Sequence, residues 1–160
     1  MLTCRSVPKE LSDIVFENQI ELELRAHTRD EALHELVGLM ANNPGVINAS
    51  ALGAEIIERE KLSATVMNND TALPHARSDN VSEIVLAVGR SRGGILFADG
   101  VVVHLIFVIG TPKNSVADYL VCVGTLARLL RNKESLRHLT EAGTVSEFAQ
   151  ILRTAMMHHV

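Results

Sequence analysis

An almost uninterrupted apolar segment, Val101 to Ile109, constrains the fold of this chain more than any other part of the sequence. Its length and its β-branched residues predict a strand, and apolar side chains on both faces of that strand need a covering layer on each side. A second apolar segment, Glu83 to Gly89, predicts another strand, and Ser91-Arg92-Gly93-Gly94 predicts a turn after it. The sequence therefore favours a sheet that is covered on both faces.

Helices are the natural covering layers, and the sequence contains signals for their ends. Thr28-Arg29-Asp30-Glu31 is a capping box, and the apolar residues that follow it up to Met40 recur at helical spacing. Asn43-Pro44-Gly45 ends this helix, and a second helix is expected from about Ala49 to Glu60. Upstream of both, the alternation from Ile20 to Leu24 suits a strand.

Two further amphipathic helices are expected in the second half of the chain. One begins around Ser115 to Asp118 and ends near Asn132, and a capping box from Thr144 to Glu147 begins the other. With helices on both sides of one sheet, the fold class is expected to be α/β. The predicted apolar faces comprise Val116, Leu120, Val123, Ala127 and Leu130 in the first helix, and Phe148, Ile151, Leu152 and Ala155 in the second.

The length and composition fit one domain and argue against several functions. A chain of 160 residues, of which 47 % are hydrophobic and 21 % charged, can bury a full core, so we expect a single domain over residues 1–160. The net charge of −4, with one Tyr and no Trp, argues against nucleic-acid binding. The apolar segments are far shorter than the roughly 20 residues that span a bilayer, and the N-terminus lacks a signal-peptide pattern, so no membrane insertion is expected.

The cysteines and most of the histidines indicate no catalytic or metal site. Cys4 and Cys122 do not suggest a disulfide framework, which favours the cytoplasm, and Cys122 is expected in the core. No His, Asp and Glu residues cluster at metal-ligand spacing, so neither a metal nor another cofactor is expected. His104 is expected to be a hydrogen-bonded core or strand-end residue, and the terminal pair His158-His159 is a weak metal site.

One histidine is presented differently from the others. The segment Thr71-Ala72-Leu73-Pro74-His75-Ala76-Arg77 places His75 directly after a proline and two residues before Arg77. Proline fixes its own φ and biases Leu73 toward extended geometry, so His75 is expected on a stiff peptide outside a regular helix. Imidazole is a nucleophile near neutral pH and a guanidinium suits phosphate oxygens, so this pair suggests phosphoryl chemistry. The alternative is a loop histidine without a role.

The motifs around His75 occur in a recognisable order along the chain. Ile57-Glu58-Arg59-Glu60-Lys61-Leu62 precedes the segment that contains His75, and four motifs follow it: Leu86-Ala87-Val88-Gly89, Gly94-Ile95-Leu96-Phe97, Val103 to Ile109, and Leu126 to Leu130. From about Leu11 to the final helix, the chain resembles the fructose/mannitol-type enzyme IIA domain of the phosphoenolpyruvate-dependent sugar phosphotransferase system, a family that includes a nitrogen-regulatory branch.

This resemblance implies a fold, an activity and partners. The implied fold is a mixed β-sheet flanked by helices on both sides. The implied activity is acceptance of a phosphoryl group on His75, with no cofactor, from the phosphorylated histidine-carrier protein HPr or its nitrogen-branch counterpart. Arg59 matches the family's arginine and is assigned to the phosphoryl group. Transport members pass the group to an enzyme IIB domain for sugar uptake, whereas regulatory members control partner proteins through their phosphorylation state, and both functions stay open.

The chain departs from the family pattern at two places. The family's second histidine, near the start of the long helix, corresponds to Tyr119, and the glycine-rich stretch before the Pro-His motif is replaced by Ala64 to Asp70. A tyrosine can hydrogen-bond a phosphate oxygen but cannot become an imidazolium. Tyr119 and Arg77 are therefore candidates to contact the phosphate or to support the site, although Tyr119 also suits a half-buried helix position and Arg59 a solvated helix end. Asp70 would repel a phosphoryl group if its carboxylate faced inward.

Overall fold

The two long apolar segments form the centre of a six-stranded mixed sheet in the computed structural model, which describes residues 11–67 and 70–158. β5 (Val85–Ala98) and β6 (Val101–Pro112) pair antiparallel, and the strand order is β1-β5-β6-β3-β2, with β4 also paired to β6. β1, β3 and β4 run parallel to their long partners, and β2 runs antiparallel to β3. The short strands are β1 (Ile20–Glu21), β2 (Val66–Met67), β3 (Thr71–Ala72) and β4 (His75–Ser78).

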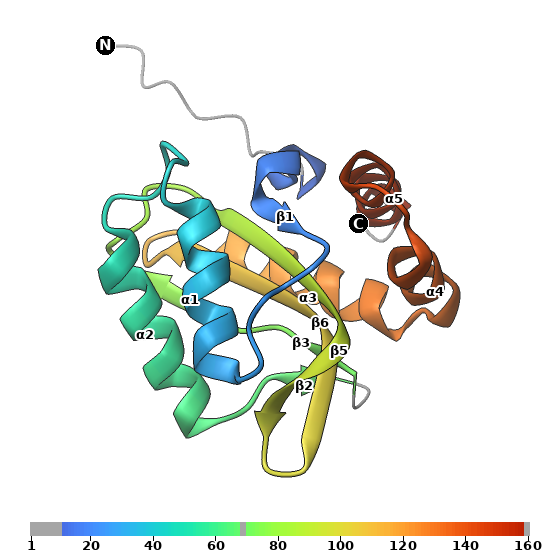
Figure 1. Ribbon diagram of the computed structural model, residues 1–160. Coiled ribbons are helices and arrows are strands. Elements are labelled where there is room, and N and C mark those ends of the chain that lie inside the picture. The colour runs from blue at the N-terminus through green and yellow to red at the C-terminus, as the bar shows by residue number, and fades with distance from the viewer. Residues whose placement is uncertain (1–10, 68–69, 159–160) are drawn as a thin grey trace.

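Helices cover both faces of this sheet, so the predicted α/β fold class is confirmed (Figure 1). α1 (Arg29–Met40) and α2 (Ala49–Leu62) lie side by side on one face. The other face is covered by α3 (Val116–Arg131), α4 (Lys133–Glu141) and α5 (Val145–His158). Two short 3₁₀ helices, η1 (Leu11–Ile14) and η2 (Glu17–Gln19), lead into β1.

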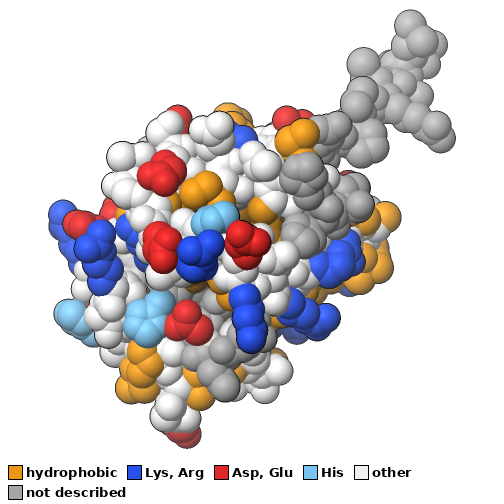
Figure 2. Space-filling model, turned by 90° about the vertical axis from the view of Figure 1, so that its right-hand side faces the viewer, with side chains coloured by type: hydrophobic (Ala, Val, Ile, Leu, Met, Phe, Trp, Pro, Cys, Tyr) orange, Lys and Arg blue, Asp and Glu red, His pale blue; other side chains and the backbone are white. Residues whose placement is uncertain are grey.

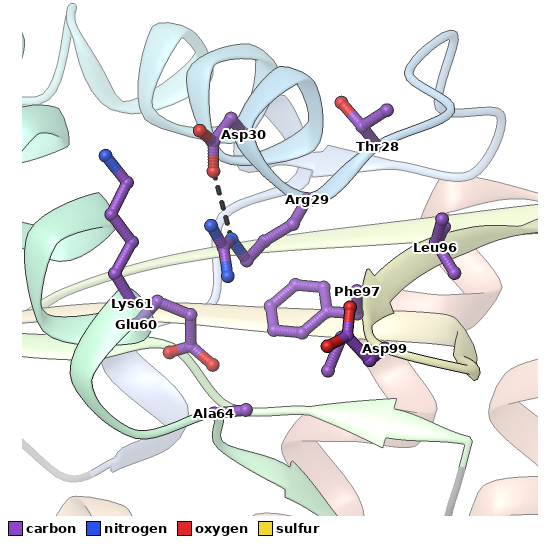
Figure 3. A pocket seen from close by; sticks show the side chains of 10 residues that line it. Thr28, Arg29, Asp30, Glu60, Lys61, Ala64, Leu96, Phe97 and Asp99 are labelled. Carbon is purple, nitrogen blue, oxygen red and sulfur yellow. Dashed lines mark hydrogen bonds and ion pairs between the residues drawn. The ribbon is translucent and has the colours of Figure 1, made fainter.

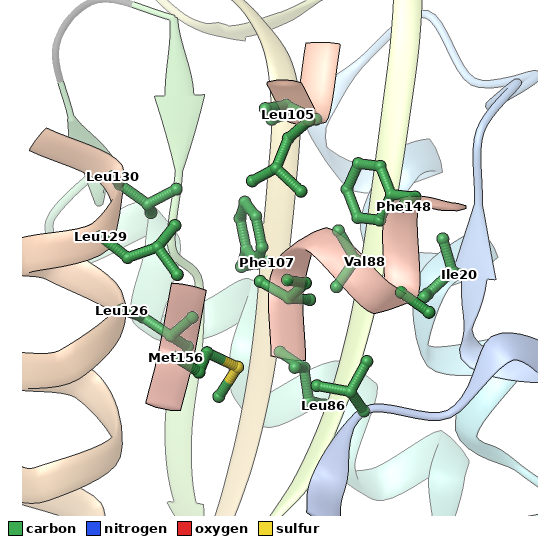
Figure 4. Close-up of a cluster of buried hydrophobic side chains, with 14 of the residues drawn as sticks. Ile20, Leu86, Val88, Leu105, Phe107, Leu126, Leu129, Leu130, Phe148 and Met156 are labelled. Carbon is green, nitrogen blue, oxygen red and sulfur yellow. The ribbon is translucent and has the colours of Figure 1, made fainter. Parts of the chain in front are cut away.

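From Leu105 to Ile109, β6 is buried on both of its faces, as its apolar sequence predicts, whereas Val102 near its beginning is exposed. Leu105, Phe107 and Ile109 belong to the core on the side of α3 and α5, whereas Ile106 and Val108 belong to the core on the side of α1 and α2. All five side chains have 0 % exposure, and burial of one such side chain contributes about 1.5–3 kcal/mol. Figure 4 shows the first of these clusters, in which side chains of β5, β6, α3 and α5 meet.

The predicted capping boxes are confirmed at the beginnings of two helices. The Thr28 side chain accepts a hydrogen bond from the backbone N–H of Glu31 before α1, and Thr144 Oγ1 accepts one from Glu147 N at 3.1 Å before α5. Asn48 has the same role before α2, where its side chain accepts from the N–H of Ala51. These side chains satisfy amide groups that have no partner within the helix.

The prediction of a turn at Ser91-Arg92-Gly93-Gly94 is wrong, because β5 continues through this segment as an irregularity of the sheet. The register shifts between the pairs Arg90–Leu105 and Ile95–Val103, so the segment bulges from the strand. Gly94 has a φ of +87°, and a Cβ on it would lie 2.4 Å from Val102 Cγ1. The turn between β5 and β6 is instead formed at Asp99-Gly100, with Gly100 at φ +70°, and this pair is a standard hairpin signal that the sequence analysis missed.

The apolar face predicted for the long helix is only partly correct. Leu130 is buried as predicted, but Val116 and Leu120 are exposed by 44 % and 63 %. The helix instead buries Cys122, Leu126 and Leu129, because α3 carries apolar residues on two sides and only one of them meets the sheet. Cys122 lies in the core as predicted, and burial raises the pKa of its thiol to about 12.

Two other elements differ from their predictions. The strand expected from Ile20 to Leu24 pairs with β5 only at Ile20–Glu21. α4 was not predicted from the sequence, although Asn132 is an N-cap whose Oδ1 accepts from Glu134 N at 3.1 Å and from Ser135 N at 3.0 Å.

Arg90 joins the bulged part of β5 to the end of α4. Its Nη1 donates to the carbonyl oxygens of Leu139, Thr140 and Ala142 at 3.1, 3.1 and 2.7 Å, and the residue is only 4 % exposed. The carbonyls at the end of a helix lack partners within the helix and carry partial negative charge, so a guanidinium satisfies them and is stabilised by them.

Substitution of Arg90 by Met is expected to destabilise the protein by about 2–4 kcal/mol, because buried carbonyls lose a charged donor. Urea denaturation of Arg90→Met, compared with Arg92→Met at a neighbouring exposed arginine, measures the effect. Equal midpoints for the two variants would show that this contact contributes no stability.

Candidate functional site

His75 lies at the first position of β4 and is held by main-chain contacts to β6. It pairs in register with Ile109, whose N–H donates to the carbonyl of Pro74 at 3.0 Å. The Nδ1 of the half-buried His75 ring lies 2.7 Å from the carbonyl oxygen of Leu73. Because a carbonyl oxygen only accepts hydrogen bonds, Nδ1 carries the proton and, in the neutral ring, Nε2 keeps its lone pair. The stiff, non-helical presentation predicted for His75 agrees with this geometry.

The surroundings of His75 favour the neutral form of its ring. Burial lowers the pKa of His75 below its usual value of 6.5, the hydrogen bond to Leu73 partly opposes this, and the positive charge of Arg59 lowers the pKa further. The imidazole is therefore uncharged at neutral pH, which is the form that can attack an electrophile.

The other candidate residues from the sequence line one cavity, which adjoins His75 through Ala76 and Tyr119. A cavity of about 390 Å³ is lined by Glu55, Arg59, Ala76, Arg77 and Tyr119. The ring centroids of His75 and Tyr119 are 5.6 Å apart with an interplanar angle of 48°, and the Arg77 guanidinium carbon lies 6.0 Å from the Tyr119 centroid. Arg77 also donates from Nη2 to the carbonyl of Lys113 at 3.0 Å. Residues from α2, β4 and α3 thus meet at one hollow.

Glu55 is a residue of this hollow that the sequence analysis missed. It lies one helical turn before Arg59 on α2, so the two side chains emerge on the same face of the helix. Its Oε1 accepts a hydrogen bond from Ser78 Oγ at 2.9 Å and another from the Nδ2 of Asn80. The i, i+4 spacing from Arg59 was the available sequence signal. The fixed carboxylate partly offsets the positive charge of the two arginines.

The carboxylate of Asp70 is engaged away from His75. Asp70 Oδ1 lies 2.5 Å from Nδ1 of His104, and both side chains are partly exposed. Asp70 precedes β3, which pairs with β6 at Leu105, whereas His75 pairs four residues further along β6 at Ile109, or roughly 13 Å away at 3.3 Å per residue. His104 is a hydrogen-bonded strand residue, in line with its prediction.

The remaining histidines and the surface point to no further catalytic or metal centre. Residues 11–67 and 70–158 contain no group of three or more His, Cys, Asp or Glu side chains that could hold a metal ion, and His159 and the side chain of His158 lie outside the described part. No helix within that part is long and apolar enough to cross a membrane. On the face shown in Figure 2, basic and acidic side chains are interspersed, unlike the continuous basic surfaces that bind nucleic acid.

The fold is that of a phosphotransferase-system enzyme IIA domain. Residues 13–155 match the family described as "Phosphoenolpyruvate-dependent sugar phosphotransferase system, EIIA 2", and the chain belongs to that family. It is 30 % identical over 131 residues to a "Nitrogen regulatory protein" of Bradyrhizobium diazoefficiens, covering 81 % of this chain and 85 % of that protein. It is 24 % identical over 145 residues to the "PTS system fructose-specific EIIABC component" of Bacillus subtilis, covering 89 % of this chain but only 23 % of that longer protein.

Solved structures show the same fold. The crystal structure of the nitrogen regulatory protein IIA-Ntr from Neisseria meningitidis superposes with a TM-score of 0.82 at 24 % identity, covering 90 % of this chain and 99 % of that one. The mannitol enzyme IIA of Escherichia coli, solved in complex with phosphorylated enzyme IIB, gives a TM-score of 0.72 at 18 % identity, covering 86 % of this chain and 95 % of that one. The chain thus has an enzyme IIA phosphocarrier fold with both sugar-specific and nitrogen-regulatory relatives.

The pKa of His75 is expected to lie below 6.5 and to rise when Arg59 is replaced by Gln, because a nearby positive charge is removed. NMR titration of the His75 ring measures both values, and Arg92→Gln is the matched control. An unchanged midpoint in Arg59→Gln would contradict the electrostatic contact between Arg59 and the ring.

The lowered pKa of His75 also makes the free energy of unfolding depend on pH. The unfolded chain takes up a proton at His75 near pH 6.5, whereas the folded protein takes it up only at a lower pH. The free energy of unfolding therefore decreases as the pH falls from 6.5 toward the folded midpoint, and this contribution of His75 is fully present above 6.5.

Proposed function

We propose that this protein is a phosphoryl carrier that accepts a phosphoryl group on Nε2 of His75 from a phosphorylated HPr-like protein and passes it to an enzyme IIB domain for sugar uptake. The observation that carries the proposal is the hydrogen bond from Nδ1 of His75 to the carbonyl of Leu73, which leaves Nε2 as the nucleophilic nitrogen. The Nε2 lone pair attacks phosphorus while the P–N bond of the donor phosphohistidine breaks, and its electron pair returns to the donor imidazole.

The charged residues of the hollow suit a transferred phosphoryl group. Arg59 and Arg77 provide guanidinium donors for its oxygens, and a guanidinium stays charged at any physiological pH. With Nδ1 still protonated, the phosphorylated ring is cationic, and the Leu73 carbonyl stabilises that charge. Glu55 limits the positive charge at the site, so the phosphoryl group is not held too strongly for onward transfer. In the second step, a thiolate of the IIB domain attacks phosphorus and the N–P bond breaks.

Exposed apolar residues next to the hollow suit protein partners of this kind. Val116, Leu120 and Val121 are exposed by 44, 63 and 51 %, and they flank Tyr119 on α3. A donor or acceptor protein that covers them brings its own phosphoryl-bearing side chain to the His75 hollow and excludes water from it. The enzyme IIA–IIB complex of the E. coli mannitol system supports an IIB domain as one such partner.

A regulatory module is the second candidate function, in which the phosphorylation state of His75 controls the affinity for a partner protein. It is favoured by the similarity to the Bradyrhizobium and Neisseria nitrogen regulatory proteins and by Tyr119 at the position of the family's second histidine. Transfer of the phosphoryl group from His75 to the cysteine of an isolated IIB domain separates the two functions, because only the transport function requires that step.

The first test is phosphorylation of the protein by phosphoenolpyruvate, enzyme I and HPr, followed by intact mass spectrometry. We expect an acid-labile gain of one phosphoryl group that is absent in His75→Ala, since the hydrogen bond at Nδ1 leaves Nε2 of His75 available for phosphorylation. The variant should keep its circular dichroism spectrum, and its free energy of unfolding should change by no more than about 1 kcal/mol, because the substitution removes a half-buried side chain with one hydrogen bond. Stable incorporation of phosphate in His75→Ala would contradict the assignment.

Tyr119→His is expected to increase the rate of phosphoryl transfer more than it changes stability. An imidazolium replaces a neutral hydroxyl beside the phosphoryl group, and one charge-assisted hydrogen bond of ~1.4 kcal/mol corresponds to about tenfold in rate. Quench-flow measurement of transfer from phosphorylated HPr gives the rate, and Tyr119→Phe is the control that removes only the hydroxyl. Equal rates in the three proteins would show that the side chain of residue 119 does not act on the phosphoryl group.

A further inference from the structure

A second cavity, of about 470 Å³, lies where the beginning of α1, the end of α2 and the tip of the β5–β6 hairpin meet (Figure 3). It shares no lining residue with the hollow beside His75. Its lining combines the buried ring of Phe97 with charged side chains of both signs, among them Arg29, Glu60 and Asp99. Neither the proposed phosphoryl transfer nor the fold accounts for this combination.

Two oppositely charged side chains line this cavity, Arg29 and Asp99, and both have polar atoms without a hydrogen-bond partner among the described residues. The Nε of Arg29 donates to Asp30 Oδ1 at 3.0 Å, and the Arg29 side chain is only 24 % exposed. Among the residues that the structure describes, none accepts a hydrogen bond from the Nη nitrogens of Arg29, and none donates one to the Asp99 carboxylate. Figure 3 shows Arg29, from the beginning of α1, and Asp99, from the tip of the β5–β6 hairpin, around the Phe97 ring.

Glu60 adds a carboxylate to the cavity, but the oxygens of this carboxylate already accept hydrogen bonds from the protein. The residue is 2 % exposed, and its Oε1 accepts from Thr65 N at 2.6 Å and from Thr65 Oγ1 at 3.0 Å. Burial raises the pKa of Glu60, while the bonds from Thr65 and the charge of Arg29 oppose that shift. The Glu60 carboxylate is therefore occupied by Thr65, whereas Arg29 and Asp99 face the open space with unused hydrogen-bonding groups.

We propose that this cavity binds a small zwitterion, an amino acid whose carboxylate pairs with the Nη nitrogens of Arg29 and whose ammonium group pairs with Asp99. A guanidinium binds a carboxylate through two parallel hydrogen bonds, and complementary charges select the partner. Three carboxylates, of Asp30, Glu60 and Asp99, line the cavity against two cations, Arg29 and Lys61, so the balance of charge does not favour a phosphate dianion. A neutral polyol would leave both charges without a counter-charge.

The test uses zwitterions of increasing length with the full chain. Glycine, β-alanine, 4-aminobutyrate and 6-aminohexanoate carry the two charges at increasing separation, and butyrate and butylammonium carry one each. Isothermal titration calorimetry is expected to find one zwitterion that binds at least about tenfold more tightly than both singly charged compounds. The preferred length reports the separation of Arg29 and Asp99.

Variants then locate the binding site. Arg29→Met and Asp99→Asn are each expected to weaken binding of that zwitterion by about tenfold or more, since each removes one of its two charge partners. Arg131→Met, at an exposed arginine outside the cavity, is the matched control and should bind like the unmodified protein. Binding no tighter than that of butyrate or butylammonium, or equal binding by Arg29→Met and Asp99→Asn, overturns the proposal. Neither result bears on phosphorylation of His75, which the mass assay tests separately.

Discussion

Two-sided burial of β6 determines where the candidate site lies. Ile109 is fully buried, and its amide donates to the carbonyl of Pro74, so the first residue of β4 is held against the buried part of β6. The ring of His75 is then fixed by the carbonyl of Leu73, within the same extended segment. These two hydrogen bonds fix the position of the His75 side chain relative to α2 and α3, which pack on the same sheet. The position of the nucleophilic nitrogen is therefore a property of the core, and loop conformation has little influence on it.

The charges around His75 suit two states of its ring, the neutral imidazole and the phosphorylated form that we propose. Before transfer, burial and the Arg59 charge both disfavour an imidazolium, so the ring is a neutral nucleophile. In the transfer that we propose, the phosphoryl group brings negative charge into a hollow that already contains Arg59 and Arg77. On that proposal, the same guanidinium that lowers the pKa of the free ring stabilises the modified ring. Tyr119 lies near both the ring and Arg77 without adding charge of its own, which distinguishes this site from one with a second histidine.

The sequence predicts those parts of the structure that depend on local chemistry. The doubly buried strand, the caps at Thr28 and Thr144 and the stiff Pro74-His75 peptide each follow from a few adjacent residues. Contacts between distant segments do not: Arg90 with the end of α4, and Glu55 with Ser78 and Asn80, exist only once the sheet has formed. Arg59 entered the candidate site through a family resemblance, because its 16-residue separation from His75 along the chain carries no local signal.

The errors in the sequence analysis have the same origin. Glycines at 93 and 94 can form either a turn or a bulge, and the outcome depends on the long pairing of β5 with β6. For α3, both apolar stripes satisfy the helical period, and only the packing of Leu126 and Leu129 on the sheet decides which stripe is buried. The stripe that remains exposed, at Val116 and Leu120, borders the candidate site. A helix face that looks like core in the sequence is thereby available for partner proteins.

α2 contributes adjacent residues to the His75 hollow and to the cavity of Arg29. Arg59 faces the His75 hollow and Glu60 faces the cavity of Arg29, since successive residues of an α-helix point about 100° apart. α2 packs on α1 and on β4, which begins with His75. One turn of α2 thus positions a residue of each cavity, although the two cavities share no lining residue.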